Sequence, residues 1–303
     1  MTEAERIAKL EPPVGKISMV LDSDTACEVD DQFALAYAVR AAQAGELVLE
    51  AICAEPFDNP PIKREEGMER SYQEILRVLD KLDAPEFKAI TYRGATEKMT
   101  DGKPVDSPAA RKIIELAMDP LRTEPLYVVG IGGATNLASA LKMQPEIAEK
   151  IIVIWLGGNS IHWPHVVEFN ACQDVTATKY LLNSGVPLVL LPAYNAIAGL
   201  ITSIPELEYY LDGKSEIGTY LVDIVKTYRA KYDPNCAWSK VIWDIAGVAY
   251  LLHPEWFQTC LVHTPIMTED RHWASDSRRP MMRICEYVQR DYIFHDVFQK
   301  LAQ

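Results

Sequence analysis

The feature that most constrains this chain is the repeated alternation of short apolar runs with segments of helical periodicity. Continuous apolar runs rich in β-branched residues are typical of strands buried on both faces of a sheet. Such runs cover residues 16–22 and 47–55, and four more begin near Ala89, Leu126, Ile151 and Val186. Helices are predicted between most of them, including 30–44 and 67–82, where apolar residues recur at helical spacing. The alternation predicts an α/β fold with an open, mostly parallel sheet that helices cover on both faces.

The pattern changes after Ala193 and is mostly helical as far as Leu252. Two further strands are predicted at 256–267 and 281–288, followed by a helix at 291–302. No Pro- or Gly-rich linker interrupts the 303 residues. We therefore predict one α/β domain over residues 1–303, with a helical, lid-like insertion at about 204–239 and a C-terminal strand pair.

The charge balance excludes several classes of partner. The chain carries 43 Asp and Glu against 30 Lys and Arg, a formal net charge of −13. Nucleic acids and anionic membranes attract basic surfaces, so neither is an expected partner. No apolar run approaches the ~20 residues that a membrane span needs, and the N-terminal segment lacks the apolar core of a secretory signal. The cysteines lie singly, without CxxC spacing, so we expect reduced thiols and a cytoplasmic location.

Acidic residues cluster where the first predicted strand ends and the next helix begins: Asp22, Asp24, Glu28, Asp30 and Asp31. Ligands bind at this carboxyl edge of open α/β sheets. Helix capping accounts for one or two of these acids, but not for Asp22 and Asp24 on the strand end as well. Converging carboxylates repel one another unless a cation neutralises them, and an all-oxygen set favours Ca²⁺ or Mg²⁺ over zinc. An EF-hand loop is excluded, because Ala26 and Cys27 stand where it needs an oxygen ligand and a glycine.

Two short motifs allow other interpretations. The Asp22-Ser23-Asp24 fragment also matches the DxD of haloacid-dehalogenase-type phosphatases, in which Asp22 would be the nucleophile. The phosphatase mechanism gives the later Asp30-Asp31 pair no role, but a phosphatase with Asp22 as nucleophile remains an alternative. The glycine-rich segment 130–136 is not a dinucleotide fingerprint, because GxGxxG would require glycine at Thr135.

The acidic motif, Asp22-x-Asp24 followed by Asp30-Asp31-x-x-Ala34, resembles the DxDPGxDDAxA of the inosine–uridine-preferring nucleoside hydrolase family. Its spacer is two residues longer, and the Pro-Gly pair is absent. Five further blocks follow in the family's order, at residues 130–136, 156–158, 167–170, 183–187 and 243–244. The resemblance implies a Rossmann-like nucleoside hydrolase fold and hydrolysis of the N-glycosidic bond of ribonucleosides, as in purine or pyrimidine salvage. It also implies Ca²⁺ as cofactor and a homodimer or homotetramer.

The resemblance also implies roles for single residues. Asp24 matches the general base that activates a calcium-bound water, chemistry that suits a metal site beside a carboxylate. The implied metal ligands are Asp24, Asp31, Asp244 and the backbone carbonyl of Ile131. The implied ribose contacts are Asp30, Glu168 and Asn170, whereas Asp22 would orient the loop from behind.

Three positions depart from the family pattern. Trp243 stands where one branch of the family has a candidate acid, His, before the late Asp. An indole is no proton donor of that kind, so we expect Trp243 to take part by stacking on the base. His162 replaces an Asn near the 5′-hydroxyl, and Asn59 is a substitute for a missing Gly-Asn pair; both are candidate substrate contacts. These departures leave the base preference open. They also leave open a nucleoside- or sugar-binding relative with an altered substrate or no turnover.

Overall fold

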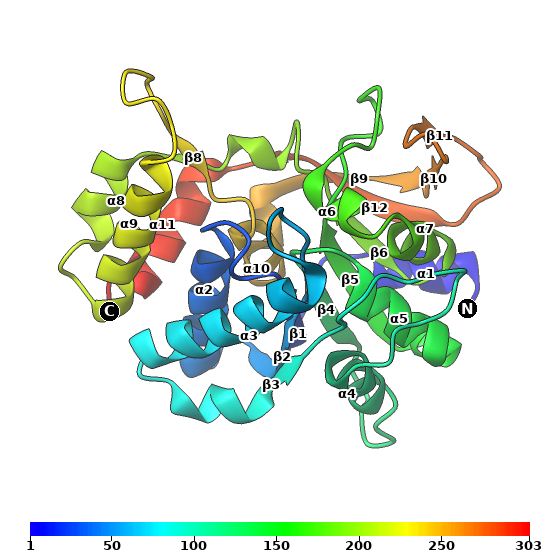
Figure 1. Ribbon diagram of the computed structural model, residues 1–303. Helices are drawn as coiled ribbons and strands as arrows, with labels where there is room; N and C mark the ends of the chain where they lie inside the picture. The colour runs from blue at the N-terminus through cyan, green and yellow to red at the C-terminus, as the bar shows by residue number, and fades with distance from the viewer.

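An eight-stranded sheet forms the centre of the protein, whose computed structural model describes residues 1–303 (Figure 1). The strand order is β3-β2-β1-β4-β5-β6-β12-β9. The strands are β1 (Ser18–Ser23), β2 (Val48–Ala54), β3 (Thr91–Arg93), β4 (Leu126–Gly130), β5 (Ile151–Leu156), β6 (Leu188–Leu191), β9 (Phe257–His263) and β12 (Met281–Val288). Every neighbouring pair is parallel except β12 with β9. The predicted parallel α/β sheet is confirmed.

Helices cover both faces because the strand residues alternate between two apolar cores. Met19 and Leu21 contact the core formed with α2 (Asp31–Gln43), α3 (Arg64–Lys81), α10 (Ile245–Leu252) and α11 (Arg290–Leu301). Val20 faces the opposite core, with α4 (Pro108–Ala117), α5 (Thr135–Met143) and α7 (Val175–Asn183). The strands are therefore apolar on both sides, which explains their continuous hydrophobic runs.

The strand order reverses between β1 and β4, and this reversal positions the site. From β1 the chain builds outward through β2 and β3 and then returns to β4 on the other side of β1. Asp22 and Gly130 are register partners at the carboxyl ends of β1 and β4. The loops after these two strands lead to opposite faces and leave a crevice between them, the usual ligand position in such sheets.

After β6, the helical region is shorter than the helical insertion predicted at about 204–239. The helical region contains α8 (Ile204–Leu211) and α9 (Glu216–Arg229), but residues 230–239 form no helix. α9 packs against α2 and α3, and α8 packs against α11. The chain returns through the short pair β7 (Ile201–Thr202) and β8 (Lys240–Val241).

The C-terminal strand pair is confirmed at the sheet edge, where β12 lies between β6 and β9. The strand expected at 256–267 is interrupted, since β10 (Ile266–Met267) pairs with β11 (Trp273–Ala274) in a separate hairpin. The two remaining α-helices are α1 (Glu3–Lys9), which contacts β12, and the short α6 (Phe169–Gln173). None of the helices has the length and apolar character needed to cross a membrane.

Candidate active site

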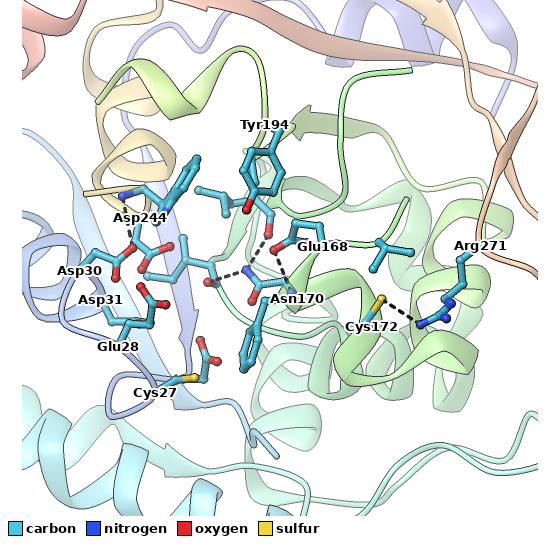
Figure 2. Close-up of a pocket in the computed structure, with 17 residues that line it drawn as sticks. Cys27, Glu28, Asp30, Asp31, Glu168, Asn170, Cys172, Tyr194, Asp244 and Arg271 are labelled. Atoms are coloured by element: carbon cyan, nitrogen blue, oxygen red, sulfur yellow. Dashed lines mark hydrogen bonds between the residues drawn. The ribbon is translucent and has the colours of Figure 1, made fainter. Parts of the chain in front are cut away.

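A cavity of about 360 Å³ opens at the carboxyl ends of β1, β4, β5 and β6 (Figure 2). Acidic side chains line one side of it and the Glu168–Asn170 segment lines another. Its lining residues are Asp24, Cys27, Glu28, Asp30, Asp31, Ile131, Leu156, Val167, Glu168, Phe169, Asn170, Cys172, Ala193, Tyr194, Trp243, Asp244 and Arg271. Most of the residues that the sequence singled out therefore share one cavity, although they come from loops up to 220 positions apart.

Three aspartates form the acidic wall. Carboxylate oxygens of Asp30, Asp31 and Asp244 lie within 4.8 Å of one another, and all three side chains are buried. Asp30 and Asp31 begin helix α2, whereas Asp244 is the residue preceding α10. The two helices pack together, so both N-termini point at the cluster. Helix N-termini favour negative charge, which offsets part of the repulsion between these carboxylates.

Burial, together with the remaining repulsion, changes the ionisation of the cluster. Burial and the neighbouring Asp30 raise the pKa of Asp31 to about 7. Burial, with the charges of Asp30, Asp31 and Asp24, also raises the pKa of Asp244 well above its ordinary value. Burial, with Asp31 and Glu55, does the same to the pKa of Asp24. Each carboxylate would ionise fully only if a positive charge were added.

The donors in this wall fit a divalent cation. Asp24 Oδ2 is buried and has no hydrogen-bond partner, although a buried carboxylate oxygen is normally satisfied. The Ile131 carbonyl lines the same cavity and accepts only one bond, from Asn170 Nδ2 at 3.0 Å. All the available ligand atoms are oxygens, which suits a hard cation. The aspartate cluster can therefore bind a metal ion.

Asp24 reaches its position because Gly132 leaves room for it. A Cβ added to Gly132 would lie 2.6 Å from Asp24 Oδ1, far inside van der Waals contact. The Gly132 carbonyl accepts a hydrogen bond from Trp155 Nε1 at 3.1 Å, which holds the loop after β4 in place. The glycine-rich segment is thus explained by a close approach to a carboxylate, not by phosphate binding.

Asp22 lies behind the cavity and does not line it. Its Oδ1 accepts a hydrogen bond from Asn136 Nδ2 at 2.9 Å, and the residue is 1% exposed. Burial and the adjacent Glu55 raise the pKa of Asp22 well above its ordinary value. A carboxylate in this position cannot meet a substrate in the cavity, so the geometry disfavours Asp22 as a phosphatase nucleophile.

A buried charge pair behind the site was missed by the sequence analysis. Glu55 accepts hydrogen bonds from the backbone N–H groups of Thr135 and Asn136, at 2.9 and 3.0 Å. Its Oε1 lies 3.9 Å from Arg64 Nη2, and both side chains are buried. Glu55 follows β2, where the family's Gly-Asn pair was absent from the sequence. That absence was the available signal for a different arrangement here.

Glu168 and Asn170 are held in fixed orientations. Glu168 precedes α6, and its carboxylate accepts backbone bonds from Gly158, Asn170 and Ala171 at 2.7–3.0 Å. Asn170 Nδ2 donates to the carbonyls of Ile131 and Leu156, both at 3.0 Å. Its Oδ1 has no donor within the protein, which leaves that oxygen free to accept from a ligand hydroxyl.

Two candidate substrate contacts lie elsewhere. Asn59 and His162 are exposed and do not line the cavity. Asn59 instead pairs with Ile62 across a tight turn. Trp243, by contrast, lines the cavity, and its backbone N–H donates to Asp30 Oδ2 at 3.2 Å.

Two more residues at the cavity were not anticipated. Lys240 Nζ lies 3.1 Å from Asp30 Oδ1 and 2.6 Å from Glu28 Oε2, buried behind the acidic wall. Tyr194 follows β6 and packs edge-on against Trp243, with ring centroids 5.8 Å apart. Tyr194 could have been noticed from its place after a buried strand, whereas nothing near Lys240 in the sequence pointed to Asp30.

Comparison with known proteins gives concordant results. The family model described as inosine-uridine preferring nucleoside hydrolase matches residues 19–295. A pyrimidine-specific ribonucleoside hydrolase RihA of Salmonella paratyphi B is 26% identical over 76% of this chain and 78% of its own. The structure of a purine-preferring ribonucleoside hydrolase from Gardnerella vaginalis superposes with a TM-score of 0.75, at 21% identity, over 95% of this chain and 98% of its own. The type III effector protein XopQ, complexed with adenosine diphosphate ribose, gives a TM-score of 0.65 at 18% identity, over 99% of this chain and 96% of its own.

Proposed function

Since the chain belongs to the inosine-uridine preferring nucleoside hydrolase family, we propose that its cavity hydrolyses the N-glycosidic bond of ribonucleosides with Asp24 as general base. One observation carries the assignment of Asp24. Its Oδ2 is buried and unpartnered, the residue feels the charges of Asp31 and Asp30, and it lines the same cavity as Glu168 and Asn170. Cleavage at an anomeric carbon requires a general base beside the attacking water and groups that bind the sugar hydroxyls. Asp24 beside the aspartate cluster and Glu168 with Asn170 on another side of the cavity meet these two requirements.

We assign the cation to Ca²⁺, held by Asp24, Asp31, Asp244 and the Ile131 carbonyl. Carboxylates together with a backbone carbonyl are typical calcium ligands. When bound, the ion would acidify a coordinated water and neutralise the carboxylates. Chelation should therefore abolish activity, and Ca²⁺ should restore it more effectively than Mg²⁺; recovery with Mg²⁺ alone would contradict the choice of ion.

The other steps of the proposed reaction are assigned to side chains of the protein. Asp24 would take a proton from the attacking water, and Asp30, Glu168 and Asn170 would accept hydrogen bonds from ribose hydroxyls. Carboxylates around the sugar also stabilise the oxocarbenium-like charge that develops as the bond breaks. Asp22 would hold the loop from behind, through Asn136. Trp243 would present its ring to the base.

The decisive assay measures reducing sugar released from purine and pyrimidine ribonucleosides in the presence of Ca²⁺. We expect Asp24→Asn to lower kcat by at least ~10²-fold, as removal of a general base does. The matched control is Asp106→Asn, an exposed aspartate that pairs only with Arg111. Wild-type protein that binds ribose but releases no base from any member of the panel would contradict the proposal.

The panel must include both kinds of base, since the named relatives include a pyrimidine-specific and a purine-preferring enzyme.

We further propose that residues 204–239 border the entrance as a lid, since Tyr228 on α9 donates to the cavity residue Glu28 at 3.3 Å. A homodimer or homotetramer in the cytoplasm is also proposed. The resemblance supports the assembly, and six unpaired cysteines fit the location. Light scattering of the purified protein would test the assembly.

A further inference from the structure

The proposed reaction has a second requirement, which concerns the leaving base. As the bond from C1′ breaks, its electron pair moves onto a base nitrogen, and a proton delivered to the base makes departure easier. The proton must come from the side of the sugar opposite the attacking water, because nucleophile and leaving group occupy opposite faces of the anomeric carbon. The donor must therefore lie across from Asp24, toward the cavity mouth.

Most proton-bearing groups of the cavity are already engaged. Asp24, Asp31 and Asp244 are the proposed metal ligands, and Glu28 and Asp30 are paired with Lys240. Burial raises the pKa of Glu168, but both of its carboxylate oxygens accept backbone N–H bonds, and the proposed function already places it as a contact of the ribose hydroxyls. Burial and the surrounding carboxylates raise the pKa of the Cys27 thiol, which makes it a poor donor.

The other groups are chemically unsuited or absent. Arg271 does not release a proton in proteins, and the indole of Trp243 is not an acid. Cys172 already contacts Arg271, with Sγ 3.9 Å from Nη1. No histidine lines the cavity. The remaining O–H group in the cavity lining is the phenol of Tyr194.

Neighbouring residues hold the backbone and ring of Tyr194 and leave its hydroxyl free to bond a ligand. Its backbone pairs with Asn159, and Asn195 beside it adopts a left-handed φ of 90°. The ring stacks on Trp163, with centroids 6.1 Å apart, and meets Trp243 edge-on. The residue is 47% exposed at the mouth, and its hydroxyl makes no hydrogen bond within the protein. Figure 2 shows Tyr194 above Glu168, on a different side of the cavity from Glu28, Asp30 and Asp31.

We propose that the Tyr194 hydroxyl is the proton donor to the leaving base, an inference that rests on the proposed function. The C1′–N bond breaks, its electrons pass to the base, and the base receives the phenolic proton. The hydroxide part of water bonds to C1′, and its proton passes to Asp24. Exchange with solvent then removes the proton from Asp24 and returns one to the Tyr194 phenolate, so water is the only reactant consumed besides the nucleoside.

The test compares two leaving groups. Tyr194→Phe keeps the ring and its contacts but removes the proton. We expect kcat on natural ribonucleosides to fall by about 10²-fold, the lower end for loss of a general acid. On 4-nitrophenyl riboside, which departs as a stable anion, kcat should stay within about twofold of wild type. Tyr209→Phe, an exposed tyrosine on α8, is the matched control and should change neither rate.

The outcomes separate the inference from the proposed function. Equal losses on both substrates, or no loss on either, would overturn the role of Tyr194 as proton donor. Wild-type protein that cleaves neither substrate would overturn the proposed function itself. Circular dichroism and thermal unfolding of Tyr194→Phe ensure that a selective loss reflects the missing proton and not a disturbed fold.

Discussion

At the residue scale, Lys240 is the cation already built into the acidic wall. Although burial lowers it, the charges of Asp30 and Glu28 raise the pKa of Lys240 above its ordinary value. The ammonium therefore remains charged and holds Asp30 Oδ1, while the Trp243 N–H holds Oδ2. Both oxygens of the proposed ribose contact are oriented in this way. Lys240 acts through Asp30 and is a positioning residue.

Replacing Lys240 by Met should cost stability and substrate binding together. Removing one partner of a buried pair leaves an uncompensated charge, at a cost of about 3–5 kcal/mol. We expect KM for the nucleoside to rise by about tenfold with a smaller change in kcat, measured alongside denaturant unfolding. Lys240→Arg, which keeps the charge, should recover part of the KM effect. An unchanged KM in Lys240→Met would show that Asp30 does not need this support.

Residues such as Lys240, whose partners are distant in the sequence, could not be predicted from the sequence. The Asp24–Asp31 cluster could be placed at the sheet edge because its position after a strand determines its location. Lys240 and Asp30 are 210 positions apart, and only the packing of the folded chain brings them together. His162 and Asn59 were proposed by position in a motif, but in the fold they lie outside the cavity lining.

At the scale of elements, the loop from β4 to α5 must pass close to Asp24. Gly132→Ala would place a methyl group against Asp24 Oδ1 and force the carboxylate to move. Because ligand geometry tolerates little displacement, we expect at least ~10-fold weaker Ca²⁺ affinity by isothermal titration calorimetry. Gly102→Ser is a control in a half-buried turn with open space around it, although its left-handed φ carries some strain of its own. Unchanged affinity in Gly132→Ala would remove Asp24 from the ligand set.

The strands and helices were predicted best where apolar periodicity continued unbroken. The strand at 281–288 has the predicted bounds, because its apolar run has clear ends. The strand expected at 256–267 stops at His263, just before Thr264-Pro265, since proline cannot donate to the ladder. The helical region likewise ends at Arg229, ahead of the turn at Asp233-Pro234-Asn235. Local breakers thus decided the boundaries that periodicity missed.

At the scale of the whole molecule, we expect the aspartate cluster to make stability depend on cation concentration. An ion that binds only the folded state adds about 2.7 kcal/mol at a hundredfold excess over Kd. For a chain of 303 residues we expect Ca²⁺ to raise Tm by roughly 4 °C. Differential scanning calorimetry with Ca²⁺ and with chelator measures this shift. The Asp106→Asn control should keep it in full.

Asp244→Asn provides the opposite test of the same cluster. Burial and, to a smaller extent, the nearby carboxylates disfavour the charge on Asp244, so without a cation its neutral amide counterpart should be at least as stable as wild type. In Ca²⁺ the order should reverse, because the variant lacks a ligand and gains little from the ion. A variant that is less stable than wild type in chelator and still gains the full Ca²⁺ shift would contradict the assignment.

The position of β12 also determines when the sheet can be completed during synthesis. β12 lies between β6 and β9, so residues 281–288 must be synthesised before either strand gains that neighbour. While the ribosome is still adding residues, β6 presents an open edge, the kind of surface on which chains associate wrongly. Completion of the sheet is thus delayed until nearly a hundred residues after β6 have been translated. We expect the protein to depend on chaperones during this interval, however stable it becomes afterwards.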